Sequence, residues 1–299
     1  MRKFLMSSVL LLAVITAQGQ TKITPTLQKG LVKSYQITAD YQIPGMSTIT
    51  TTADDTYTVT DATADGYIIN YVSTNFKSTA AESDITGQIL NAANTLLADL
   101  TITIVTDKDG KVLRIANYDE LKKQLDVNSD KMVDKILAAA PPAAAQAMPK
   151  DTFKGLVMQG LSEDKLLKSL QDANSVLTLN GKTLSTGMQE QFINAKEAKM
   201  KRLYFVNGKD ITCNAVLDMT TEEIKAVIIA KLTESMPEQA DIIKQNIDQL
   251  IASGMLKFEM QENATYQLDA DGWLKSIKVE DTANTMGQKT VITTTITVK

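Results

Sequence analysis

The sequence contains no histidine and only one cysteine, Cys213, among its 299 residues. Without histidine the chain lacks the usual general base and the commonest transition-metal ligand, and it cannot form Ser-His-Asp or Cys-His catalytic arrangements. A single cysteine can form neither an intrachain disulfide nor a thiolate cluster for zinc. We therefore expect no catalytic residues, metal ion or cofactor, and any catalysis would rest on carboxylates, lysine, tyrosine, serine or threonine.

Aromatic residues are also scarce, at 5% of the chain with one tryptophan. This leaves little ring surface for stacking sugars, so a carboxylate-dependent glycan hydrolase is an alternative and not the favoured reading. The formal net charge is −4, with both signs interspersed along the chain. Such a chain repels phosphate backbones, so nucleic acid is not an expected partner.

The N-terminus has the pattern of a secretory signal peptide. Arg2 and Lys3 precede an apolar run from Phe4 to Ile15, and Ala17-Gln18-Gly19 supplies small residues for cleavage. We predict a signal peptide over residues 1–19, cleaved near Gly19-Gln20, and a periplasmic or secreted mature protein. The apolar run is too short to span a bilayer permanently, and we expect no transmembrane span in the mature chain.

Strand signals dominate both ends of the remaining sequence. Leu31 to Thr60 is rich in Thr, Tyr, Ile and Val with frequent alternation, and Pro44-Gly45 interrupts it. These features predict an antiparallel meander that continues through Tyr67–Tyr71. Further strands are predicted as hairpins around Asp107–Gly110, Asn180-Gly181 and Asn207-Gly208, and in four runs between Leu256 and Val298.

Helical spacing occupies the middle of the chain. We predict helices over 84–100, 117–125 and 128–139, one capped by Ser162, and one opened by the capping box Thr220-Thr221-Glu222-Glu223. Pro237 would begin the last helix and Gly254 would end it. The last two helices form a predicted hairpin whose apolar side chains are candidate ligand contacts: Ile224, Val227, Ile228, Ile243, Ile247, Met236 and Met255.

Together these patterns predict an α+β protein with a large, twisted antiparallel sheet, open like a half-barrel, and helices packed on one face. Residues 20–299 would form a single α+β domain. Two halves of that domain, 20–137 and 148–299, would be joined by an Ala- and Pro-rich crossover at 138–147; a true interdomain linker is the alternative.

Other polar motifs have structural explanations. Asp107-x-Asp109-Gly110 and Asp269-x-Asp271-Gly272 resemble the opening of a calcium loop, but the later ligands are missing, so both are predicted hairpin turns. The acids Asp54, Asp55 and Asp65 are assigned to turns. The basic cluster 196–202 is assigned to a solvated strand or helix edge, with a phosphate or lipid head-group site as the alternative. Cys213 is assigned to a buried position.

Several of these features also resemble those of known protein families. The chain resembles an uncharacterised family of exported Bacteroidota proteins, a domain of unknown function, in four segments: the leader ending Ala-Gln-Gly-Gln, Lys29-Gly30 before the meander, Asp107–Val112 and Ala264–Trp273. The order of strands and helices is similar to the periplasmic lipoprotein-carrier fold. That similarity implies an open antiparallel sheet that holds an acyl chain against helices on its concave face.

The favoured hypothesis is therefore an exported, non-enzymatic envelope protein that binds an apolar ligand, such as a lipid or a lipoprotein acyl chain, or an envelope protein partner. The alternatives are the carboxylate-dependent glycan hydrolase and a structural or surface-interaction protein without a small ligand.

Overall fold

The computed structural model describes residues 19–81, 85–140, 149–194, 197–235, 240–252, 258–285 and 288–299. The predicted signal peptide, apart from Gly19, lies outside these residues, as do most of the predicted crossover, Pro237 and Gly254. Across the described parts of the chain, no helix is both long enough and apolar enough to cross a membrane.

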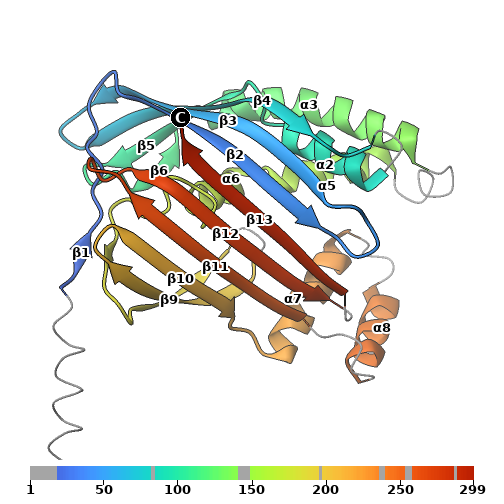
Figure 1. Cartoon of the computed structure of the whole chain (residues 1–299). Coiled ribbons are helices and arrows are strands. Elements are labelled where there is room, and N and C mark those ends of the chain that lie inside the picture. Colours follow the sequence, from blue (N-terminus) through green and yellow to red (C-terminus); the bar gives the residue numbers. More distant parts are fainter. Residues whose placement is uncertain are drawn as a thin grey trace, which may run out of the picture.

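Eleven antiparallel strands form one open sheet in the order β6-β5-β4-β3-β2-β13-β12-β11-β10-β9-β8 (Figure 1). The N-terminal strands are β2 (Val32–Gln42), β3 (Ile49–Ala62), β4 (Gly66–Ser78), β5 (Thr101–Asp107) and β6 (Val112–Ile115). The C-terminal strands are β8 (Gln189–Ile193), β9 (Lys199–Asn207), β10 (Asp210–Leu217), β11 (Phe258–Leu268), β12 (Leu274–Thr285) and β13 (Gln288–Val298). Strands β2 and β13 pair at the centre, so the two ends of the chain share one sheet.

The two faces of the sheet differ because side chains alternate along each strand. One row across five strands aligns Thr38, Thr295, Lys278, Thr265 and Thr212. The neighbouring row, on the opposite face, aligns Ile37, Ile296, Ile277, Tyr266 and Ile211. The polar row faces solvent and the apolar row faces the core, so the strand alternation in the sequence assigns both faces.

The apolar face is concave, and two irregular segments cover one end of it. Ile23 and Leu27 come from the N-terminal segment, which also forms the short strand β1 (Thr21–Lys22) paired with β7 (Thr183–Leu184). The second segment, 171–182, consists of turns, and its buried residues include Val176, Leu177 and Leu179. These side chains form the main core together with the apolar rows of the sheet.

Six helices are present in the described residues: α2 (Ile85–Thr95), α3 (Tyr118–Ala139), α5 (Lys150–Gly160), α6 (Glu163–Leu170), α7 (Thr221–Ser235) and α8 (Ala240–Ala252). Figure 1 shows α2, α3, α5 and α6 behind the sheet and the α7–α8 pair beside the ends of β11–β13. The predicted α+β class, with an open antiparallel sheet and helices, is confirmed.

Three local predictions are wrong for identifiable reasons. The two helices predicted over 117–125 and 128–139 are one helix, α3, because no glycine or proline interrupts it. The hairpin predicted around Asn180-Gly181 does not form, because the buried run 176–179 covers the core and Thr183–Leu184 pairs with β1. Asp54 and Asp55 do not lie in a turn but within β3.

The predicted capping box at Thr220 and the turn at Asp107 are confirmed, whereas Ser162 occupies the N-cap position of α6 without a side-chain capping hydrogen bond to any described residue. The backbone N–H of Glu223 donates to Thr220 Oγ1 (3.2 Å) and that of Thr220 donates to Glu223 Oε2 (2.7 Å), which is a reciprocal capping box. Asp107 Oδ1 accepts hydrogen bonds from the backbone of Asp109 and Lys111, both at 2.9 Å. The carboxylate therefore closes the turn between β5 and β6.

A β-bulge in β4 redirects its final residues. The register with β3 shifts between the pairs Thr52–Lys77 and Asp54–Thr74, and Asn75 adopts a left-handed backbone with φ 54°. Asn75 Nδ2 donates to Asp54 Oδ2 (2.8 Å) on the solvent-facing side, while Phe76 lies on the concave side. The bulge therefore turns Phe76 toward the concave face.

This geometry generates a stability prediction. Asn75→Val should lower the free energy of unfolding by about 1–2 kcal/mol more than Asn75→Gly, because a β-branched residue is strained at positive φ and glycine is not. Both variants lose the same hydrogen bond to Asp54, so the difference between their free energies of unfolding reports the backbone strain at position 75. Urea denaturation of the pair measures it, and equal stabilities would contradict the assignment.

Candidate functional site

The concave face is covered at one end and open at the other. At the open end lies a cavity of about 470 Å³, here called the concave cavity, whose walls come from strands of both chain halves and from α2. Its apolar wall includes Ile37, Tyr41, Phe76, Met200, Met260 and Ile292. Its polar wall includes Thr51, Asp55, Asp172, Glu262, Asp281 and Thr294. A volume of this size is in the range of small-molecule sites, about 300–1,000 Å³.

Asp55 is the most perturbed polar group in this cavity. It lies in β3 with 5% of its surface exposed, and hydrogen bonds from Ser73 and Tyr71 support its carboxylate. Oδ1 has no hydrogen-bond partner among the described residues. Burial raises the pKa of Asp55 to about 6, and the neighbouring charge of Asp54 adds to this effect. A buried carboxylate with a raised pKa in a cavity is typical of functional sites.

Three tyrosines flank Asp55 on the covered side. Tyr57 stacks on Tyr71 with ring centroids 4.9 Å apart and meets Tyr35 edge-on at 6.0 Å. Burial raises the pKa of all three hydroxyl groups above the ordinary value. The phenols therefore stay neutral at physiological pH and form a rigid floor beside the carboxylate.

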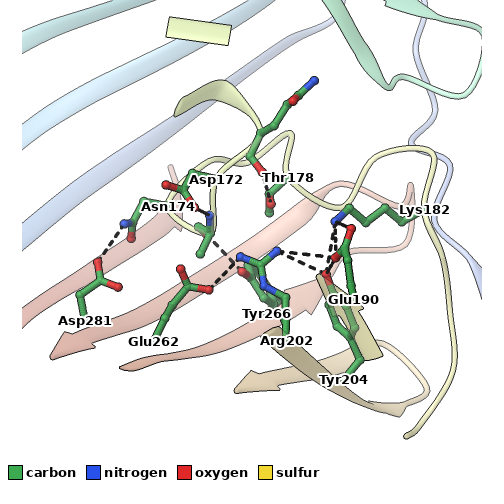
Figure 2. Close-up of polar contacts among 12 residues, drawn as sticks. Asp172, Asn174, Thr178, Lys182, Glu190, Arg202, Tyr204, Glu262, Tyr266 and Asp281 are labelled. Carbon is green, nitrogen blue, oxygen red and sulfur yellow. Dashed lines mark hydrogen bonds and ion pairs between the residues drawn. The ribbon is translucent and has the colours of Figure 1, made fainter. Parts of the chain in front are cut away.

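A buried ion pair borders the opposite side of the concave cavity. Arg202 Nη2 donates to Glu262 Oε1 at 2.9 Å, and the two side chains are 3% and 9% exposed (Figure 2). The guanidinium also lies 3.9 Å from the ring centroid of Phe192. Burial raises the pKa of Glu262 even though Arg202 opposes this shift. Pairing with a guanidinium is what makes a buried carboxylate tolerable.

The network continues from Arg202 to a second carboxylate. Tyr204 donates its hydroxyl proton to Glu190 Oε2 (2.7 Å), and Lys182 Nζ donates to the same oxygen at 3.0 Å (Figure 2). Burial opposes ionisation of Glu190, but Lys182 and the Tyr204 hydroxyl outweigh it and lower its pKa. Glu190 is therefore ionised and balances the positive charges beside it.

Glu262 and Asp281 are direct cross-strand neighbours on β11 and β12, and both line the concave cavity. Opposed residues on one face have Cβ atoms about 4.5–5.5 Å apart. Asn174 Nδ2 donates to Asp281 Oδ2 at 3.4 Å, and Figure 2 shows Asn174 close to both Asp172 and Asp281. Two carboxylates are thus held side by side at the cavity wall.

A second cavity of about 320 Å³ lies beyond Arg202. It shares Asp172 and Asn194 with the concave cavity, but its lining also includes Lys111, Lys168 and Lys182. Within the described residues, no cluster of three carboxylate or thiol side chains is arranged to hold a metal ion.

The predicted ligand contacts lie elsewhere in the described structure. Ile224, Val227 and Ile228 are half-buried on α7, and Ile247 is buried on α8. Ile243 belongs to α8, whereas Met236 and Met255 are outside the described residues. The two helices pack on each other and are joined by an ion pair between Lys225 and Asp248. The contact role of these residues stays a prediction.

Asp55 and Arg202 lie in the interior, contrary to their predicted turn and edge positions. Asp55 alternates with Tyr57 and Val59, and Arg202 alternates with Met200 and Tyr204, so period-two spacing places both on the concave face. The assignment of Arg202 to a solvated edge is therefore wrong. Cys213 is buried as predicted, and burial raises its pKa to about 12.

No protein-family model matches this chain, and no curated protein matches it. Among solved structures, one that describes lipid–protein interactions in lipovitellin is similar, with a TM-score of 0.41 and 9% sequence identity. The match extends over 92% of this chain and 25% of the lipovitellin chain, so this chain spans about a quarter of that protein's length. The resemblances to the Bacteroidota family and to the lipoprotein-carrier fold stay predictions.

The raised pKa of Asp55 gives a pH-dependent stability. Because the native carboxyl binds its proton more tightly than the unfolded one, stability falls as pH rises from about 4 to about 6. Asp55→Asn should remove this loss and raise the free energy of unfolding above pH 6 by up to about 3 kcal/mol, with the gain vanishing near pH 4.

Denaturant unfolding at pH 4, 6 and 8 measures this gain. Asp54→Asn is the matched control, because Asp54 lies on the other face of β3 and pairs with Lys299 at 2.6 Å. The control should gain no stability at any pH. A gain for Asp55→Asn that is equal at pH 4 and pH 8 would contradict the assigned burial.

The buried ion pair generates another prediction. Glu262→Met should lower the free energy of unfolding by about 3–5 kcal/mol, because it leaves Arg202 buried without its carboxylate. The double variant Arg202→Met/Glu262→Met should recover most of this loss, since neither charge remains to be desolvated. A double-mutant cycle in urea tests the pair, and additive losses would show that the two side chains are not coupled.

Proposed function

We propose that this protein is an exported, non-enzymatic envelope protein that binds a lipid-like apolar chain in the concave cavity. The observation that carries the proposal is the cavity itself, an opening of about 470 Å³ between the sheet and its covering segments. Its wall combines flexible methionines (Met200 and Met260) with fixed aliphatic and aromatic residues. Methionine adapts to ligands of irregular shape because its thioether chain is unbranched and polarisable.

Two further features support a binding role. The bulge at Asn75 places Phe76 in the cavity wall although regular alternation would point it outward. The covering segment 171–182 contributes only Asp172 and Asn174 to the wall of the concave cavity, so the apolar side chains of the strands still line much of it. Export is supported by Arg2, Lys3 and the apolar run that follows them.

Recovery of the bound molecule tests the proposal directly. Lipid extraction and mass spectrometry of protein purified from its native host should yield an amphiphile in stoichiometric amount. Recovery of none, together with no binding of added apolar probes, would refute the proposed function.

A cavity-filling variant gives the corresponding prediction. Ala283→Phe should weaken binding of the neutral probe 1-dodecanol by about tenfold or more, because Ala283 lines the concave cavity and the ring would occupy space needed for the chain. Ala270→Phe is the matched control at an exposed turn position. Isothermal titration calorimetry below the probe's solubility limit measures the affinity of both variants. An unchanged affinity in Ala283→Phe would show that the chain does not bind in the concave cavity.

A carboxylate-dependent glycan hydrolase is the second candidate, favoured by one observation. Glu262 and Asp281 are cross-strand neighbours in the cavity wall, and the pKa of Glu262 is raised by burial, as a general acid requires. Against it, Glu262 is held by Arg202. Release of reducing sugar from envelope glycans that is lost in Glu262→Gln would favour this candidate over simple binding.

A further inference from the structure

The charged residues around the concave cavity are of one sign. Four carboxylates line it: Asp55, Asp172, Glu262 and Asp281. As far as the chain is described, the residues that line this cavity include no lysine and no arginine. Arg202 lines the second cavity instead and is bound to Glu262. Even with Arg202 offsetting Glu262, the carboxylates that line the concave cavity leave it with a net negative charge.

Asp55 adds a specific acceptor to this negative charge. Asp55 lies at the cavity wall with 5% of the residue exposed, and Oδ1 has no hydrogen-bond partner in the described part of the chain. A buried carboxylate oxygen without a donor costs free energy that a ligand donor would recover. A positively charged donor recovers the most, because it both bonds to the oxygen and neutralises the charge.

The geometry points to an amphiphile whose head group carries a protonated amine, with the amine bound at Asp55 and the chain along the apolar wall. This inference rests on the proposed function and adds the class of ligand. Free fatty acids and other anionic amphiphiles are disfavoured, because their head group would meet carboxylates with no cation available in the cavity wall. Selection thus comes from repulsion of the wrong head group as well as attraction of the right one.

Three probes of equal chain length separate the head group from the chain: dodecylamine, 1-dodecanol and dodecanoate. Titrated into the purified protein at pH 7.5 below their micelle-forming concentrations, dodecylamine should bind about tenfold or more tightly than 1-dodecanol, and dodecanoate more weakly than either. Isothermal titration calorimetry gives all three affinities under one condition.

The variant Asp55→Asn identifies the group responsible. It should reduce the preference for dodecylamine over 1-dodecanol by about tenfold, while its affinity for 1-dodecanol stays within about twofold. Asp65→Asn, at an exposed position that does not line the cavity, should leave all three affinities unchanged. Circular dichroism and thermal melts verify that both variants are folded.

The possible results separate amine selectivity from chain binding. Equal affinities for the three probes, or tighter binding of dodecanoate, would overturn the amine selectivity while leaving chain binding in place. An amine preference that survives in Asp55→Asn would overturn the role of Asp55. Binding of none of the probes would refute the proposed function, and the inference with it.

Discussion

The pairing of β2 with β13 is the constraint on which the rest of the structure depends. These two strands come from opposite ends of the chain and are paired over eight residues on each strand, from Val291–Gln42 to Val298–Tyr35. Without this pairing the protein would be two separate meanders with exposed central edges, which are prone to aggregate. With it, β3 and β12 curve around a common concavity, and Asp55 comes to share a cavity with Glu262 and Asp281. The site therefore requires long-range β pairing, the slowest kind of contact to form.

Desolvation determines the chemistry inside that concavity. Three buried strand positions that could hold valine or isoleucine instead hold Asp55 in β3, Glu262 in β11 and Arg202 in β9. Arg202 and Glu262 satisfy each other, and replacing such a pair by apolar residues is often neutral or stabilising. Asp55 has no counter-ion among the residues described, and burial raises its pKa to about 6. The desolvation of Asp55 lowers the stability of the sheet and has no structural benefit. Residues that reduce stability in this way are concentrated at functional sites.

The sequence predicted the fold class because its signals are local and agree with one another. Alternation in β2 and β13, the Asp-Gly turns and the capping box at Thr220 each follow from short-range chemistry. The site was harder to predict because it depends on which strands become neighbours. Asp55 was assigned to a turn because aspartate is rare in strands, although its spacing from Tyr57 indicates the inner face. Nothing local indicates that Arg202 meets Glu262, sixty residues further along the chain.

The positions of the charges divide the interior into two unlike compartments. Arg202 lies between them and directs its guanidinium to Glu262 on one side and to the Tyr204–Glu190 group on the other (Figure 2). Within the described ranges, the lining of the concave cavity thus includes four carboxylates and no lysine or arginine, whereas the lining of the second cavity includes Lys111, Lys168 and Lys182 beside Asp172 and Glu190. Because charges in a poorly solvated interior are weakly screened, this separation persists at physiological salt. Under the proposed function, an apolar chain would fit against the wall of the concave cavity whatever its head group. The arrangement of charges, more than the apolar surface, would then determine which amphiphile is bound.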